Sequence, residues 1–185
     1  MGANVESTTM AATDVATAMQ RAQTVFSRRP EAALQDDATA SARWESGTRI
    51  VASHANGTQI PSDMPCELGG TGDRISPGWL FRAGIASCTA TTIAMAAAAD
   101  GIDVTTLEVQ VGSRSDSRGL LGMTDADGKR VSAGPSDYRI VVRIAAPGTS
   151  AEQLRAVVEE GLHRSPMQHA LKNAMPATIQ VELAD

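Results

Sequence analysis

Two cysteines, Cys88 and Cys66, are the residues of this chain best suited to covalent chemistry. Cys88 lies within the uncharged run 83–99, and Ser76-Pro77 ahead of it is a typical helix start. A helix dipole acts only on its first turn, so a reactive thiol at Cys88 would need a nearby cation and access to solvent. Two interpretations stay open: a nucleophilic thiol, or a buried structural cysteine, because free cysteine is among the most buried residue types.

Cys66 lies in the loop 61–75, which carries two prolines and three glycines. It either resolves an oxidised Cys88 when the loop folds over the helix, or is an incidental loop residue. The spacing of the two cysteines matches no metal-binding pattern, and no histidine lies at ligand spacing from either of them. We therefore expect no metal and no cofactor.

Hydrophobic periodicity predicts the elements that must position these thiols. Helices are expected over 13–28, 77–99, from Ser150 to a break at Ser165-Pro166, and from there to about Asn173, and strands over 40–44, 49–53, 58–60, 107–111, 138–144 and 179–183. The run 83–99 has no face designed for water, which predicts a buried central helix. This order of elements indicates an α+β domain with antiparallel sheets rather than a nucleotide-binding βαβ array.

Length and composition predict one main domain, 38–185, preceded by a helical arm, 1–37. Apolar residues make up 42% of the chain, but many are alanine and aromatic residues are only 3%. Each helix therefore offers little apolar area, and we expect a partner subunit to add burial.

The charge and the ends of the uncharged run restrict partners and location. The net charge is −5 and the basic residues are scattered, which argues against a nucleic-acid surface. The run 83–99 is bracketed by Arg82 and Asp100 and is rich in Ala and Thr, so it is expected to be a core helix and not a membrane span. The first residues show no secretory signal, and two cysteines in such a chain indicate the reducing cytoplasm.

Four short motifs together resemble the OsmC/Ohr family of osmotically inducible and organic-hydroperoxide-resistance proteins. They are Leu68-Gly69-Gly70, Ser76-Pro77-x-x-Leu80, Ala86-Ser87-Cys88-Thr89 and His163-x-Ser165-Pro166. The resemblance covers roughly residues 38–184. It implies an OsmC-like fold, with antiparallel sheets around a long buried central helix, assembled as an intertwined homodimer.

The resemblance also implies roles for individual residues. In active members the central-helix cysteine, here Cys88, attacks the O–O bond of a hydroperoxide and becomes a sulfenic acid that a second cysteine resolves. An arginine from the early strands stabilises the thiolate; Arg49 is the first candidate and Arg43 the second. A glutamate near the start of the central helix orients that arginine.

The chain departs from this pattern at two positions. Ser165 stands where the family has its second cysteine, and Gly78 stands where it has the glutamate. Cys66 or an external thiol would then have to resolve Cys88. Arg82 is an alternative cation for the thiolate. We expect Arg43, Arg82, His163 and Ser165 to line the substrate pocket.

Three functions are consistent with these residues. The first is a cytoplasmic, cofactor-free thiol peroxidase that reduces organic hydroperoxides through Cys88 and protects against oxidative stress. The alternative is a non-catalytic OsmC-fold protein that binds a small hydrophobic ligand in the cleft of the dimer interface. A different reaction of Cys88 with His163 and Ser165 is the third.

Overall fold

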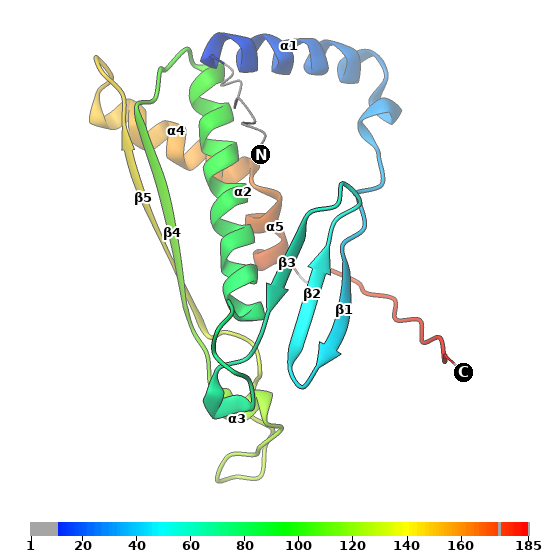
Figure 1. Ribbon diagram of the computed structural model, residues 1–185. Helices are drawn as coiled ribbons and strands as arrows, with labels where there is room; N and C mark the ends of the chain where they lie inside the picture. Colours follow the sequence, from blue (N-terminus) through cyan, green and yellow to red (C-terminus); the bar gives the residue numbers. More distant parts are fainter. Residues whose placement is uncertain (1–10, 174, 185) are drawn as a thin grey trace, which may run out of the picture.

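The computed structural model describes residues 11–173 and 175–184, and it places two antiparallel sheets beside a long helix, α2 (Figure 1). The first ten residues of the predicted arm lie outside the described residues. The elements are α1 (Ala12–Arg28), η1 (Pro30–Ala33), β1 (Ser41–Ser46), β2 (Arg49–Ser53), β3 (Gln59–Ser62), η2 (Cys66–Leu68), α2 (Pro77–Ala99), β4 (Thr106–Arg114), α3 (Ser117–Leu120), β5 (Asp137–Ala145), α4 (Ala151–Arg164) and α5 (Pro166–Lys172).

Helix α2 begins and ends where the sequence predicts. The Ser76 side chain accepts a hydrogen bond from the backbone N–H of Trp79, and Pro77 occupies the first helical position. After Asp100 the chain turns at Gly101, whose φ of 68° lies in the left-handed region that favours glycine. Local sequence signals therefore set both the start and the end of the helix.

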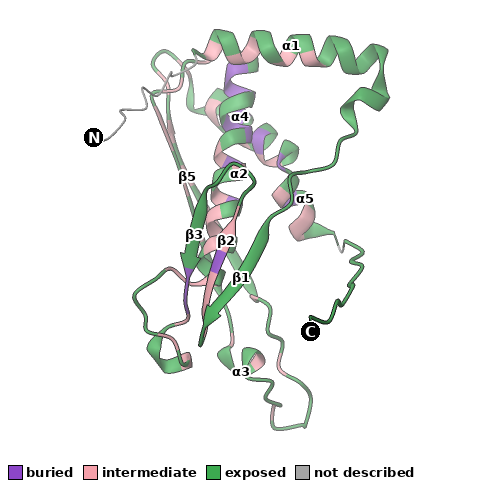
Figure 2. Ribbon diagram, turned by 45° about the vertical axis from the view of Figure 1, so that its right-hand side comes forward, coloured by how far each residue is buried: buried purple, intermediate pink, exposed green. Residues whose placement is uncertain are grey.

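One side of α2 carries the core. Ile93, Ala96 and Ala97 of α2 pack with Val157 of α4, and apolar residues of β4 and β5 surround this cluster. Helices α4 and α5 and strand β4 contact this side of α2 (Figure 2). Burial of these residues is what holds the second half of the chain together.

The other side of α2 is open in the single chain. Gly84, Ser87, Thr91 and Ala94, spaced by three or four residues, are exposed and uncharged. The prediction of a helix buried all round is therefore met on one side only, because a single copy covers only that side.

The two sheets are built from short antiparallel pairings. Strands β1, β2 and β3 form one sheet in that order, and β4 pairs with β5 over nine residue pairs, from Thr106↔Ala145 to Arg114↔Asp137. A parallel bridge between Ser62 and Ile75 joins the end of β3 to the chain just before α2. This bridge fixes the first sheet relative to the start of the central helix.

The predicted closing strand over 179–183 is wrong for the single chain. Within the described residues 175–184 the backbone forms neither strand nor helix. Ile179, Val181 and Leu183 alternate as a strand would, yet they are largely exposed, Leu183 to 92%. Alternation gives the faces of a strand but supplies no neighbour to accept its hydrogen bonds.

By length and composition, α2 is also apolar enough to cross a membrane. The core helix of a globular protein meets the same criterion, and α2 packs against other helices and a strand on its buried side.

The closest approach of α4 to α2 supplies a test of this packing. A Cβ atom on Gly161 would lie 2.6 Å from both the Cα and the Cγ1 atoms of Ile93. We expect Gly161→Ala to lower the free energy of unfolding by about 1–3 kcal/mol, because backbone must move to admit the methyl group. Glu159→Ala, at an exposed position of the same helix, should change it by less than about 0.5 kcal/mol. Equal effects of the two variants in urea denaturation would contradict this packing.

Candidate functional site

Cys88 lies on the side of α2 that faces the junction between α4 and α5. Its Sγ atom is 3.5 Å from the Oγ atom of Ser165. Ser165 is 0% exposed, and Cys88 is half-buried, between the exposed Ser87 and the buried Thr89. The thiol therefore sits at the edge between the covered and the open side of the helix.

The local sequence at Ser165 explains how its hydroxyl is oriented. Ser165 is the residue before α5, Pro166 is the first helical residue, and the Ser165 Oγ accepts a hydrogen bond from the backbone N–H of Gln168. A serine hydroxyl has one proton to donate and two lone pairs that accept. With Gln168 as donor to the oxygen, the Ser165 proton is free to be donated to the sulfur of Cys88.

A second buried contact fixes the same pair of elements. The Nε2 atom of Gln168 donates to the Oγ1 atom of Thr89 at 3.4 Å, and both side chains are buried. Thr89 directly follows Cys88, so this contact holds α5 against the turn of α2 that carries the thiol. Buried polar groups are paired here, as a stable interior requires.

Arg49, the first candidate for the thiolate partner, is engaged elsewhere in this chain. Its guanidinium lies 2.8 Å from Asp73, 2.9 Å from the Thr71 hydroxyl and 3.6 Å from Asp63. Asp73 and Thr71 come from the loop before α2, whereas Arg49 begins β2. The arginine is therefore held between two carboxylates, and neither of them comes from the start of α2, where the resemblance predicts a glutamate.

Asp63 is the most buried ionisable group of this network, with 1% of its surface exposed. The Thr48 hydroxyl donates to it at 2.6 Å, and the backbone N–H groups of Met64 and Thr71 donate at 2.8 and 2.9 Å. These donors, that of Thr48 foremost, hold the pKa of Asp63 well below its ordinary value. The Thr71 hydroxyl likewise lowers the pKa of Asp73, and Arg49 adds to this effect.

The two other predicted arginines form their hydrogen bonds with residues other than Cys88. Arg43 is exposed and pairs with Glu45, and the guanidinium of Arg82 donates to the Ser113 hydroxyl on β4 at 3.3 Å.

Cys66 is exposed and its thiol donates to the backbone carbonyl of Thr71, 3.3 Å away within the same loop. The carbonyl of His163 lies 2.8 Å from the Nε2 atom of His169, so the two histidines contact each other across the helix break. Of the predicted site residues, the structure brings only Cys88 and Ser165 into contact with each other within residues 11–173 and 175–184.

Within the described ranges, no arginine is within hydrogen-bonding distance of the Cys88 sulfur, and no group of three or more His, Cys, Asp or Glu side chains is placed to hold a metal ion.

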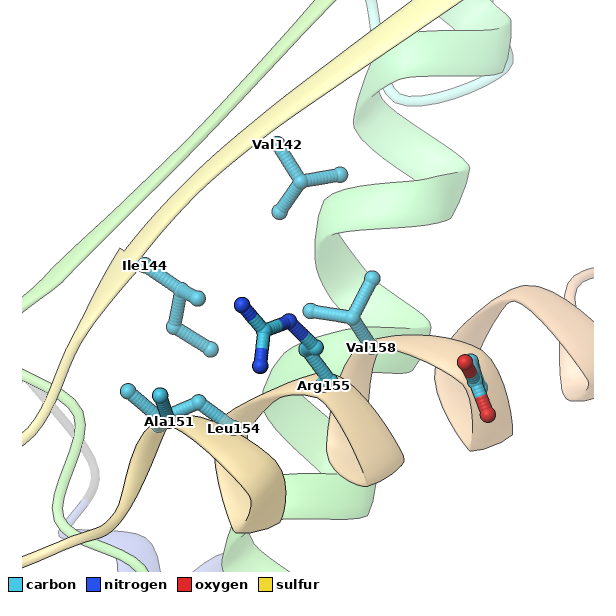
Figure 3. A pocket seen from close by; sticks show the side chains of 7 residues that line it. Val142, Ile144, Ala151, Leu154, Arg155 and Val158 are labelled. Atoms are coloured by element: carbon cyan, nitrogen blue, oxygen red, sulfur yellow. The ribbon is translucent and has the colours of Figure 1, made fainter.

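A ligand-sized hollow lies between β5 and α4 (Figure 3). Its volume is about 330 Å³, and the apolar side chains of Val142, Ile144, Leu154 and Val158 line it, with Arg155 beside them. Cys88 does not line it. This hollow is thus separate from the thiol chemistry of the candidate site.

Comparisons with known proteins identify the family. The model of the family described as OsmC-like protein matches residues 70–180, more than half of the sequence, so the chain belongs to the OsmC-like protein family. No curated protein matches the chain.

Solved structures share the fold. An OsmC-like protein from Mycoplasma pneumoniae superposes with a TM-score of 0.63 at 18% identity, covering 76% of this chain and 91% of its own. An organic hydroperoxide resistance protein OsmC from Legionella pneumophila gives a TM-score of 0.51 at 21% identity, covering 75% and 92%. One from Elizabethkingia anophelis gives 0.52 at 19% identity, covering 76% and 93%. The predicted family and the α+β OsmC-like fold are confirmed.

Sequence reasoning missed the residues that surround the predicted ones, namely Asp63, Asp73, Thr48, Thr71, Thr89 and Gln168. Gln168 had a usable signal, because Ser165-Pro166-x-Gln168 has the spacing of a helix-capping motif. No sequence signal predicts the carboxylates around Arg49, because their contacts join β2 to a loop more than ten residues away.

The buried carboxylate gives a pH-dependent test. Since folding lowers the pKa of Asp63, its stabilising effect is fully present above about pH 4, the ordinary range of an aspartate, and is lost as the pH falls towards the lower native value. We expect Asp63→Asn to lower the unfolding temperature at pH 7, and the difference from the parent chain to shrink below pH 4. Asp127→Asn, at an exposed turn, is the matched control. A difference that is constant from pH 7 to pH 3 would contradict the assignment.

Proposed function

We propose that this protein is a thiol-dependent hydroperoxide reductase in which Cys88 is the reacting thiol. The contact between Cys88 and the fully buried Ser165 hydroxyl is the observation that carries the proposal. A hydroxyl in contact with the sulfur fixes the position of the Cys88 side chain at the edge of the open side of α2, and a thiol that reacts must be accessible. The family and its relatives named organic hydroperoxide resistance proteins support the same class of substrate.

The proposed reaction has two stages. The Cys88 thiolate attacks the terminal oxygen of ROOH and the O–O bond breaks, so that Cys88 is oxidised to a sulfenic acid. The leaving RO⁻ takes a proton from water and departs as ROH. Ser165 has no thiol to form a disulfide. An external thiol therefore attacks the sulfenic sulfur and releases water, and a second external thiol reduces the mixed disulfide and regenerates Cys88.

The working unit we propose is a homodimer. The uncharged, small-residue stripe on the open side of α2 supports it. Cys88 lies at the edge of this stripe, so a second copy packed there would close the site. Arg49 remains our candidate for the cation, because two carboxylates fix its guanidinium and about a third of its side chain stays exposed.

The cytoplasm is the location we propose, because both thiols are free and the second stage consumes reducing thiols. The reaction as written uses organic hydroperoxide and an external thiol reductant, and no cofactor.

Stopped-flow mixing with cumene hydroperoxide tests the role of the thiol. We expect Cys88→Ser to lower the second-order rate constant about a thousandfold or more, because the nucleophile is lost. Cys66→Ser should leave both the first turnover and multiple turnovers with external thiol unchanged, because Cys66 is bonded within its own loop. If Cys88→Ser reacts as fast as the parent chain, the enzymatic proposal is wrong and the ligand-binding alternative takes its place.

The Ser165 hydroxyl is tested by its removal. We expect Ser165→Ala to slow reaction with hydroperoxide about tenfold at pH 7, because one hydrogen bond to the reacting sulfur is lost, and to slow the alkylation of Cys88 by iodoacetamide at the same pH. Ser150→Ala is the control, since it removes the equivalent cap of α4 without touching Cys88. Identical alkylation rates at pH 7 for Ser165→Ala and Ser150→Ala would leave Ser165 with a structural role only and refute this part of the proposal.

A further inference from the structure

Helix α1 has one apolar stripe along its whole length. The stripe is formed by Ala12, Val15, Met19, Ala22, Val25 and Phe26. Within the described residues Ala12–Arg28 none is buried. The opposite side carries Thr17, Gln20, Arg21, Thr24 and Arg28, so one side of the helix is suited to packing and the other to water.

Only the first half of this stripe has cover from its own chain. Ala12 and Val15 line a mainly apolar hollow of about 720 Å³ together with Met95 and Ala98 of α2. From there α1 runs across the end of α2 and away from it, and its distal end projects beyond α2 in both views (Figures 1 and 2).

The second half of the stripe lacks such cover. Val25 is 37% exposed and Phe26 is 42% exposed. An isolated helix of this length is marginally stable in water, and packing of its apolar face supplies most of the stability that helices have in proteins. The distal part of the stripe lies beyond α2, so a second surface is needed to bury its apolar side chains.

We propose that the distal half of α1 packs on a second copy of this chain and acts as a clasp on the dimer. Two observations favour a second copy as the occupant. The apolar stripe of α1 continues from a hollow partly lined by the open, uncharged side of α2, and Val25 and Phe26 at the distal end of the stripe are exposed. A standard interface needs only about 800 Å² from each partner.

Helix α1 lies outside the residues 70–180 that the family model matches. The inference rests on the proposed homodimer but not on any reaction of Cys88. Mass and hydroperoxide turnover are therefore separate measurements, and one can fail without the other.

Sedimentation velocity over a dilution series of the full chain tests the clasp. The variant Val25→Asp/Phe26→Asp places two charges on the distal stripe, and Thr24→Asp/Ser27→Asp places two charges on the opposite side of the same turn. We expect the first pair to raise the dimer dissociation constant at least tenfold, because each of two symmetric copies loses an apolar anchor. The second pair should leave it within about twofold, since surface charges that lose no packing have small effects.

Each outcome decides the proposal. An unchanged dissociation constant for the stripe variant, with a lower unfolding temperature that does not depend on protein concentration, would mean that the stripe packs on its own chain. A parent chain that is monomeric at all concentrations would overturn both the homodimer and the clasp, while leaving hydroperoxide turnover as an independent result. If circular dichroism shows that the stripe variant is unfolded, the milder variant Val25→Ser/Phe26→Ser in the full chain replaces it, with a rise in the dissociation constant again expected.

Discussion

The contact of α2 with the helix pair α4–α5 is the constraint on which the site depends. Gly161 lets the two helices approach to backbone distance at Ile93, and one turn further along the pair Gln168–Thr89 ties α5 to the same helix. Ser165 lies between Gly161 and Gln168 in the chain, and Cys88 directly precedes Thr89. The two contacts therefore bring the Ser165 hydroxyl to the Cys88 thiol.

This constraint explains how a serine can occupy the position where the family resemblance predicts a second cysteine. Ser165 ends α4, caps α5 and contacts the thiol at once. The first two tasks need only a side-chain oxygen that accepts an N–H, whereas a disulfide would need a thiol. Ser165 therefore fills the structural roles of this position, and in the proposed reaction an external thiol reduces the oxidised Cys88.

Much of the fold could be predicted from the sequence, because its signals are local. Ser76-Pro77 starts α2, Gly101 ends it, and alternation indicates β4 and β5. The prediction of a C-terminal strand failed, since alternating residues show which side of a strand faces inwards but do not provide a neighbouring strand. The carboxylates at Arg49 could not be predicted either. Their contacts arise from tertiary structure, when the loop before α2 folds back on β2.

The central claim is that the sulfur of Cys88 is the atom that hydroperoxide oxidises, and trapping its product tests this directly. The chain is mixed with one equivalent of cumene hydroperoxide in the presence of dimedone, which captures sulfenic acids, and the modified peptide is found by mass spectrometry. Our account predicts one adduct, on the peptide that contains Cys88, with a matching consumption of hydroperoxide. Unmodified Cys88 with hydroperoxide left intact, or an adduct on Cys66 alone, would contradict it.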